Sequence, residues 1–290
     1  MKNSLPSIIL GSGQFIGVNH LSHERGDERA NKFKNINQVI ELINIAKEIG
    51  YSGIMFSTHP HSLEIIQELS KNAKLKDSFL VYPNLPYIQK YVTGANEMGM
   101  IGFVFEMIKK GNARSLLRAS TGVITKNIFS MIKSLIDIEL NTFRKVQMGT
   151  VFLHNVLTDI IASLELDDII HLYIDHIQKT YGVKAGFVTL NLPKLSEYFC
   201  KLGIVDSVVQ APVNKIGFQM NPNLSSNIDT INNFKGNIIA MSTLAAGYIH
   251  PSEAYKFISE LNNVNSIIVG GSSQDHLSET YKEIKGIYSD

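Results

Sequence analysis

The amino-acid sequence predicts an α/β protein folded as a (β/α)8 TIM barrel, in which eight parallel strands alternate with helices. Short apolar runs recur along the chain between amphipathic stretches. Each run is almost continuously apolar, as expected of parallel strands that are covered on both faces. The chain has 290 residues, of which 44% are hydrophobic and 18% are charged. This length and composition suit one barrel, so we predict a single domain over residues 1–290.

The barrel strands are predicted from eight apolar runs. They are Ser7–Leu10, Gly53–Ser57, Phe79–Pro83, Gly149–His154, Lys184–Thr189, Ser207–Gln210, Asn237–Met241 and Ser266–Val269. A ninth apolar run, Met100–Phe105, falls between the third and fourth strands. Either it is a barrel strand, and another of the eight is not, or residues 94–127 form a helical insertion. We predict the insertion, which would serve as a lid or a contact between subunits.

The helices are predicted from apolar residues that recur every three or four positions. One such pattern covers Asn37–Ile49 and stops at Gly50, a residue type that commonly ends helices. Comparable patterns cover Leu63–Asn72, Asp167–Tyr181, Pro193–Leu202 and Pro251–Leu261. Two of these begin with proline, which is favoured in a first helical turn because its missing N–H would have no partner there.

Composition and charge limit the class of partner. Lys and Arg number 27 against 26 Asp and Glu, and no long basic run occurs, so we expect neither nucleic acid nor a membrane surface to bind. No apolar stretch approaches the roughly 18 residues of a membrane span, and the first ten residues lack the apolar core of a signal peptide. The single cysteine, Cys200, suits a reducing cytoplasm. We therefore predict a cytoplasmic protein that acts on a small molecule.

A glycine-rich loop follows the last predicted strand. Gly270, Gly271, Ser272 and Ser273 separate an apolar run from a polar segment that begins a helix. Backbone N–H groups at such a junction can hold an anion such as phosphate. The loop is therefore predicted to bind an anion, although the same residues also suit a simple strand-to-helix turn.

Histidines are the candidate acid–base residues. His59 and His61 follow the second strand, and His154 ends the fourth. In a (β/α)8 barrel the residues that follow the strands gather at the C-terminal mouth, where active sites are built. If the chain is extended there, side chains two residues apart point the same way, and both His59 and His61 face the mouth. Histidine titrates near neutral pH, so we predict that these three residues are catalytic.

Other polar residues are also expected at the mouth. Asn19 and His20 follow the first strand and are predicted to bind the substrate. The His-x-His pair could instead bind a divalent metal, but Asp275 is the one carboxylate near the last strand that could complete such a site. We therefore name no metal ligand.

Several segments, taken in order and spacing, resemble the aldo-keto reductase superfamily over most of the chain. They are residues 50–58 with Glu64, residues 132–135 through 151–154, and residues 185–195, 208–214, 240–247 and 270–273. The resemblance implies NADP as a cofactor. It also implies that Gln210 contacts the nicotinamide, that the loop of Gly270, Gly271, Ser272 and Ser273 holds the cofactor phosphates, and that His154 is the catalytic-site histidine.

The catalytic tetrad of that family is Asp, Tyr, Lys and His, and this chain departs from it at three positions. Ser57 stands at the Asp position, and Tyr82-Pro83-Asn84 covers the Lys position. The Tyr position falls near His61 or Ser62. His154 alone is kept. We predict that Ser57, Tyr82 and Asn84 bind the substrate.

Three functions therefore remain open. The first is non-redox acid–base chemistry, as in a lyase, isomerase or hydrolase, in which His154 and the His-x-His pair act on a polar or phosphorylated substrate; the incomplete tetrad favours it. The second is a divergent NAD(P)-dependent oxidoreductase, which Gln210 and the glycine loop favour and which needs another proton donor, such as Tyr82 or Tyr87. The third is a non-catalytic binding or regulatory barrel. The sequence leaves the cofactor and the oligomeric state open.

Overall fold

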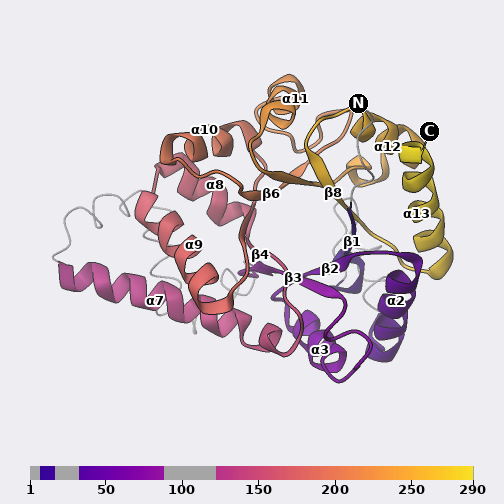
Figure 1. The fold of residues 1–290 in the computed structure, drawn as a ribbon, viewed down its shortest axis with the longest axis horizontal. Coiled ribbons are helices and arrows are strands. Elements are labelled where there is room, and N and C mark those ends of the chain that lie inside the picture. The colour runs from indigo at the N-terminus through magenta and orange to yellow at the C-terminus, as the bar shows by residue number, and fades with distance from the viewer. Residues whose placement is uncertain (1–6, 17–32, 88–121, 290) are drawn as a thin grey trace.

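The computed structural model describes residues 7–16, 33–87 and 122–289, with the backbone alone for residues 122–127. Within these ranges eight parallel strands close into a barrel. Each strand pairs with its neighbours in chain order until β8 pairs with β1. The described helices lie around the outside of this ring of strands (Figure 1). The predicted (β/α)8 barrel is confirmed.

All eight predicted strands form, and their ends differ from the prediction by at most two residues. The strands are β1 (Ser7–Gly11), β2 (Gly53–Ser57), β3 (Leu80–Leu85), β4 (Val151–Leu153), β5 (Ala185–Val188), β6 (Val208–Pro212), β7 (Asn237–Met241) and β8 (Val264–Val269).

The five predicted helices also form, and four more are present in the described part of the chain. The helices are α2 (Ile36–Ile49), α3 (Pro60–Leu69), α7 (Gly122–Leu140), α8 (Asn155–Leu164), α9 (Asp167–Tyr181), α10 (Leu192–Leu202), α11 (Leu224–Asn233), α12 (Pro251–Ser259) and α13 (Gln274–Ser289). Short 3-10 helices are η1 (Gly13–Ile16), η2 (Thr142–Lys145) and η3 (Ala245–Gly247).

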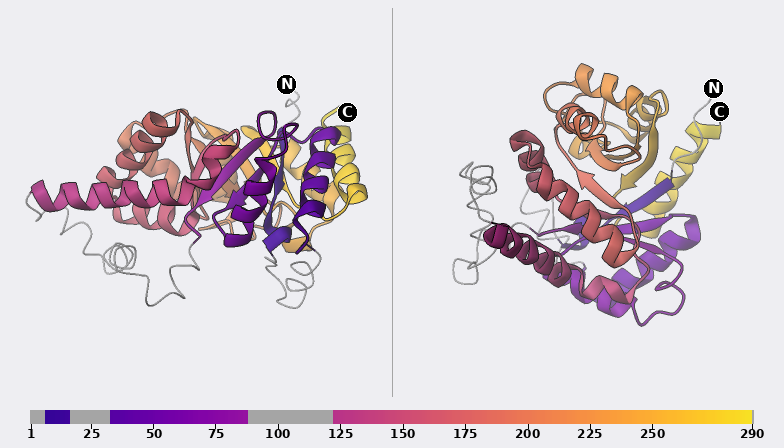
Figure 2. Two further views of the ribbon diagram at one scale, coloured as in Figure 1. Left: turned by 90° about the horizontal axis from the view of Figure 1, so that it is seen from below. Right: turned by 60° about the vertical axis from the view of Figure 1, so that its left-hand side comes forward.

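The predicted insertion, residues 94–127, lies mostly outside the described residues, as does the whole of Met100–Phe105. The barrel closes on the eight described strands without that apolar run. The last residues of the predicted insertion belong to α7, which continues to Leu140 and contacts α9 and β3. One end of α7 extends past the barrel (Figures 1 and 2).

Alternation along the strands creates two apolar cores. Outward side chains such as Phe56 and Leu85 pack in a large core with the helices. The inner core fills the barrel and consists of Ile9, Met55, Phe152, Val188, Val208 and Ile239, with Tyr82, Met241 and Ile268 packed on it. None of the eight strands contains Lys, Arg, Asp, Glu or His. The strands therefore contribute no charge to the inside of the barrel.

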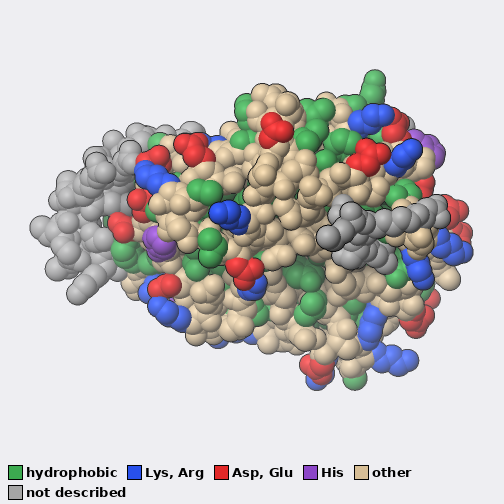
Figure 3. All heavy atoms as spheres, turned by 45° about the horizontal axis from the view of Figure 1, so that its top comes forward, with side chains coloured by type: hydrophobic (Ala, Val, Ile, Leu, Met, Phe, Trp, Pro, Cys, Tyr) green, Lys and Arg blue, Asp and Glu red, His purple; other side chains and the backbone are tan. Residues whose placement is uncertain are grey.

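Charged side chains of both signs are distributed over the outer surface. On the face drawn in Figure 3, Lys and Arg lie among Asp and Glu and do not gather into one patch. Many of them form ion pairs, such as Lys184 with Asp206 at 2.8 Å and Lys215 with Glu253 at 2.5 Å. No helix in the described part of the chain is long and apolar enough to cross a membrane.

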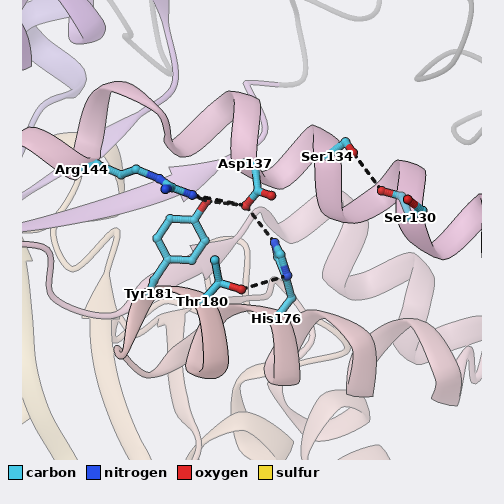
Figure 4. Close-up of polar contacts among 7 residues, drawn as sticks. All are labelled: Ser130, Ser134, Asp137, Arg144, His176, Thr180 and Tyr181. Atoms are coloured by element: carbon cyan, nitrogen blue, oxygen red, sulfur yellow. Dashed lines mark hydrogen bonds and ion pairs between the residues drawn. The ribbon is translucent and has the colours of Figure 1, made fainter.

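A polar network joins α7 to α9 on the outside of the barrel (Figure 4). Asp137 Oδ1 accepts a hydrogen bond from the Tyr181 hydroxyl at 2.5 Å and lies 2.8 Å from Nε2 of His176. The Arg144 guanidinium donates to the Tyr181 oxygen at 3.1 Å. Burial alone would raise the pKa of Asp137, but the bonds from Tyr181 and His176 and the charge of Arg144 outweigh it and lower that pKa.

Replacing Tyr181 with phenylalanine should lower the free energy of unfolding by about 1 kcal/mol, because Asp137 loses one hydrogen bond in a half-exposed setting. Urea unfolding of both proteins measures the difference. Tyr248→Phe is a matched control, since Tyr248 is 81% exposed and should change stability little. Equal stabilities of the two variants would show that the network does not stabilise the fold.

Candidate active site at the mouth of the barrel

Three polar side chains point into the barrel near the C-terminal ends of their strands. Ser57 is the last residue of β2, and Asn84 is its register partner in β3. Gln210 lies in β6, which is opposite β2 in the closed order of strands. The alternation that sends Met55 and Val208 inward also sends Ser57 and Gln210 inward. We call Ser57, Asn84 and Gln210 the mouth triad.

Each residue of the mouth triad has a buried oxygen without a hydrogen-bond partner among the described residues. These atoms are Ser57 Oγ, Asn84 Oδ1 and Gln210 Oε1. The other end of the Gln210 amide is held, because its Nε2 donates to Sδ of Met241 at 3.1 Å. Leaving a buried polar group unpaired costs about 1–3 kcal/mol, and most such groups in proteins are paired. The triad therefore has hydrogen-bonding capacity that a ligand in the mouth would use.

His154 follows β4 and caps α8. Its ring Nδ1 accepts a hydrogen bond from the backbone N–H of Val156 at 3.3 Å. The backbone N–H of His154 donates to the carbonyl of Leu85 at 2.8 Å. Burial lowers the pKa of His154 to about 4, so the ring is neutral at pH 7. Because Nδ1 accepts, the proton of the neutral ring lies on Nε2. Since Phe152 points inward and Leu153 outward, alternation places His154 on the inner side as a hydrogen-bond donor.

His59 and His61 do not point the same way. His59 caps α3, and its Nδ1 accepts from the N–H of His61 at 3.1 Å. The His61 ring instead lies 3.1 Å from Oε2 of Glu64 and 3.1 Å from the carbonyl of Phe33. The chain is not extended there, because α3 begins at Pro60, so the argument that turned both rings the same way does not hold. The catalytic role of His59 and His61 stays a prediction. Burial lowers the pKa of His59, and the nearby His61 lowers it further. Glu64 partly offsets this by raising the pKa.

The two tyrosines of the third strand region point toward opposite ends of the barrel. The Tyr82 ring lies over Gly53 and Gly149, where an added Cβ would come within 2.8 Å and 2.4 Å of it. Both glycines stand at or before the start of their strands, so Tyr82 fills the N-terminal end of the barrel. This placement does not favour the predicted contact between Tyr82 and the substrate, which stays a prediction. Tyr87 follows β3 at the mouth end, and its ring centroid lies 4.8 Å from that of His59.

The glycine loop connects β8 to α13, as predicted. Gly271 packs against Leu277, where a Cβ would come within 2.3 Å of that side chain. Nε2 of Gln14, from η1, donates to the Gly271 carbonyl at 3.0 Å. Ser273 stands directly before α13 and caps it, since its Oγ accepts a hydrogen bond from the N–H of His276 at 3.3 Å. The loop is thus a tight junction tied to the segment after β1.

The electrostatics of this loop give little support for binding a highly charged anion. Asp275 lies in the first turn of α13, where its charge already interacts with the positive end of the helix dipole. Residues 264–281 include neither Lys nor Arg. Phosphate binding by Gly270, Gly271, Ser272 and Ser273 stays a prediction.

The loop after β7 adopts a strained backbone conformation. Ser242, Ala245 and Ala246 have φ angles of 52°, 46° and 60°, which are uncommon for residues that carry a Cβ. Asn214 holds this loop to the one after β6: its Nδ2 donates to the Ser242 carbonyl at 3.3 Å and to the Phe218 carbonyl at 2.9 Å. Strain of this kind is concentrated at ligand-binding sites, and this loop belongs to the segments that resemble the aldo-keto reductases.

Some predicted site residues are not placed by the structure. Asn19 and His20 lie outside the described residues. Within the described ranges, no three His, Cys, Asp or Glu side chains come together as a metal site. Cys200 is an exposed free thiol on α10.

Two residues that support the site are missing from the sequence prediction. Met241 could have been found as the last inward position of a predicted strand. Gln14 stands directly after the Gly11-x-Gly13 turn, a position that indicates a mouth loop. Asn214 stands out in the sequence as a polar residue after a buried strand, where it could contact a ligand or satisfy backbone groups, and the structure shows it bonded to the Phe218 and Ser242 carbonyls.

A closed (β/α)8 barrel with polar side chains at the C-terminal ends of its strands has the architecture of a TIM-barrel protein with its site at the mouth. More specifically, its fold is that of the aldo-keto reductases. No protein-family model matches the sequence, and no curated protein matches it by sequence. The likeness of fold is found by comparison with solved structures.

Three of these structures illustrate the likeness. The holo form of aldo-keto reductase AKR11C1 from Bacillus halodurans has 10% identity and a TM-score of 0.60 over 98% of this chain and 90% of its own. The thermostable aldo-keto reductase Tm1743, in complex with the inhibitor epalrestat, has 12% identity and a TM-score of 0.56 over 100% and 99%. A mutant of Gox0644 in complex with NADPH has 11% identity and a TM-score of 0.53 over 98% and 89%. At these identities the likeness is one of fold.

Proposed function

We propose that this protein is a divergent NAD(P)-dependent oxidoreductase that acts on a small molecule at the barrel mouth. The observation that carries the proposal is the buried Oε1 of Gln210, which has no partner within the described ranges and stands at the position that resembles the family's nicotinamide contact. The likeness to aldo-keto reductases, including Gox0644 with bound NADPH, favours this function over the non-redox acid–base chemistry that the incomplete tetrad predicted.

The residues of the mouth fit a nicotinamide. Gln210 is only 5% exposed, and its Oε1 would accept a hydrogen bond from the carboxamide N–H. Met241 fixes the amide in that orientation. A bound nicotinamide would supply or accept the hydride. The neutral His154 ring would donate from Nε2 to the substrate oxygen and orient it.

Reduction of a carbonyl also requires a proton for the oxygen, and we assign that role to Tyr87. The family's tyrosine position is not occupied by tyrosine, and Tyr82 points away from the mouth. Burial raises the pKa of Tyr87, so its hydroxyl is protonated at neutral pH but is a weaker acid than an exposed tyrosine. The ring lies against His59. Tyr87→Phe should therefore lower kcat while the affinity for the nucleotide is retained.

The phosphate end of the site favours the less charged nucleotide. The glycine loop and the start of α13 lack Lys and Arg, and Asp275 lies in the first helical turn. An additional 2′-phosphate would meet no cation from this segment. We therefore expect NADH to bind at least as tightly as NADPH.

The test is a titration with NADH and NADPH, followed by the fluorescence of the bound nicotinamide. Gln210→Ala should weaken binding by roughly 2- to 12-fold, the effect of losing one hydrogen bond of about 0.5–1.5 kcal/mol. The matched control is Gln178→Ala, on the exposed surface of α9, which should leave Kd unchanged.

If neither nucleotide binds, the oxidoreductase proposal fails. The second candidate, non-redox acid–base chemistry by His154 and His59, would then be favoured. Both rings have lowered pKa values, so each is neutral at pH 7 and can accept a proton from a substrate. A third outcome, ligand binding that is unaffected by His154→Ala, would favour a non-catalytic barrel.

The cytoplasmic location stays a prediction.

A further inference from the structure

Ser57 and Asn84, which we call the neutral pair, are held facing into the barrel by their chain neighbours. Phe56 is fully buried on the outer side of β2. Thr58 lies on the same outer side, where its Oγ1 donates to a carboxylate oxygen of Glu139 in α7. Because both neighbours of Ser57 are held outside the barrel, the serine side chain must point inward.

Asn84 is held in the same way from the next strand. Leu85 is 2% exposed and belongs to the outer core, and its carbonyl accepts from the N–H of His154 at 2.8 Å. The register places Asn84 beside Ser57, so the two side chains share one patch of the inner wall. Each side chain is partly exposed, while Ser57 Oγ and Asn84 Oδ1 are buried and have no hydrogen-bond partner among the described residues.

The unpaired atoms of this patch, among the described residues, are a neutral hydroxyl and a neutral amide oxygen. The Asn84 oxygen can only accept hydrogen bonds, and the Ser57 hydroxyl can accept or donate. No strand contributes a charged residue to the barrel interior. A carboxylate or phosphate placed here would bring its oxygens against the unpaired Asn84 oxygen, with no cation from the strands to offset its charge. A hydroxyl or amide N–H would satisfy the unpaired oxygens.

We propose that the neutral pair is a substrate subsite that binds a hydroxyl or amide group by accepting its hydrogen bond, and that it selects an uncharged substrate over its anionic analogue. This inference rests on the proposed function for the location of the substrate, and it narrows the substrate class. A small rotation of the Asn84 amide presents its oxygen to a ligand that enters through the mouth.

The test uses two probes of one skeleton, lactamide and lactate, without nucleotide. Saturation-transfer NMR titrations measure the affinity of each. The wild-type protein should bind lactamide at least about five-fold more tightly than lactate. Ser57→Ala and Asn84→Leu should each weaken lactamide binding by about five-fold. Asn84→Lys, which introduces a cation, should reverse the preference.

Asn262→Ala is the matched control, since Asn262 is exposed in the loop before β8, and it should bind as the wild type does. Circular dichroism of each variant shows that it is folded, and two independent substitutions guard against one that is not. The proposal is overturned if neither probe binds, if lactate binds as well as lactamide, or if both folded variants keep the wild-type affinity. Because nucleotide is absent, this result is independent of whether NADH binds.

Discussion

Replacing Phe152 with alanine is expected to lower the free energy of unfolding by about 3–5 kcal/mol. Phe152 is fully buried in the inner core and faces Tyr82 with ring centroids 6.5 Å apart. The closed sheet around it holds the backbone, so the cavity left by the ring cannot collapse easily. Urea unfolding of the wild type and the variant measures the difference.

The matched control is Phe257→Ala, because Phe257 is only partly buried on α12. This substitution should lower the free energy of unfolding clearly less than Phe152→Ala does. A second arm uses the residue beneath the ring. An added Cβ at Gly186 would lie 2.6 Å from Phe152, so Gly186→Ala alone should destabilise by about 1–3 kcal/mol. Combined with Phe152→Leu it should cost less than the two single effects added together. Strict additivity would contradict the packing described here.

Lowering the pH from 7.5 to 5.0 is expected to remove about 2 kcal/mol of stability through His154 alone. The ordinary histidine pKa is 6.5, and burial lowers that of folded His154 to about 4. Below pH 6.5 the unfolded chain therefore binds a proton that the folded chain does not. Stability falls as the pH drops from 6.5 to about 4 and then levels off, since both states are protonated below that.

Urea unfolding at the two pH values measures this effect for the wild type and for His154→Gln. Other groups also titrate in this range, so the informative quantity is the difference between the two proteins. His250→Gln, at an exposed position before α12, should keep the wild-type dependence. An equal loss of stability in the wild type and in His154→Gln would show that the His154 ring is not desolvated.

The strands could be predicted because burial on both faces leaves a signature in each strand by itself. The runs around Ile8, Ile54 and Ile239 are apolar without alternation, and nothing outside them is needed to recognise it. Helices were harder to predict where their boundaries are unusual. Helix α8 begins with His154 as its cap, a residue type that is not a common start signal, and α11 carries few apolar residues. Neither is among the predicted helices.

The geometry of the site was predicted less well, because it depends on the direction in which each side chain points. His61 was expected beside His59 in an extended chain, although Pro60 is a first-turn residue and does begin a helix. Tyr82 was placed in the correct strand, but no sequence pattern shows that its ring lies over Gly53 and Gly149. Ser57 was placed at the end of its strand and predicted to bind the substrate, but its inward direction was not predicted. Its unpaired oxygen could be recognised only once the neighbouring side chains were placed.

The neutral inner wall also limits how this chain could evolve toward its structural relatives. Ser57→Asp alone would place an unpaired negative charge on the inner wall, and Asn84→Lys alone an unpaired positive one, and each change is expected to destabilise the fold. Because the two positions are register partners, both changes together would place the charges beside each other. Single-substitution steps between this barrel and one with a charged pair therefore pass through a destabilised intermediate, so the two kinds of site are separated by a mutational barrier despite their common fold.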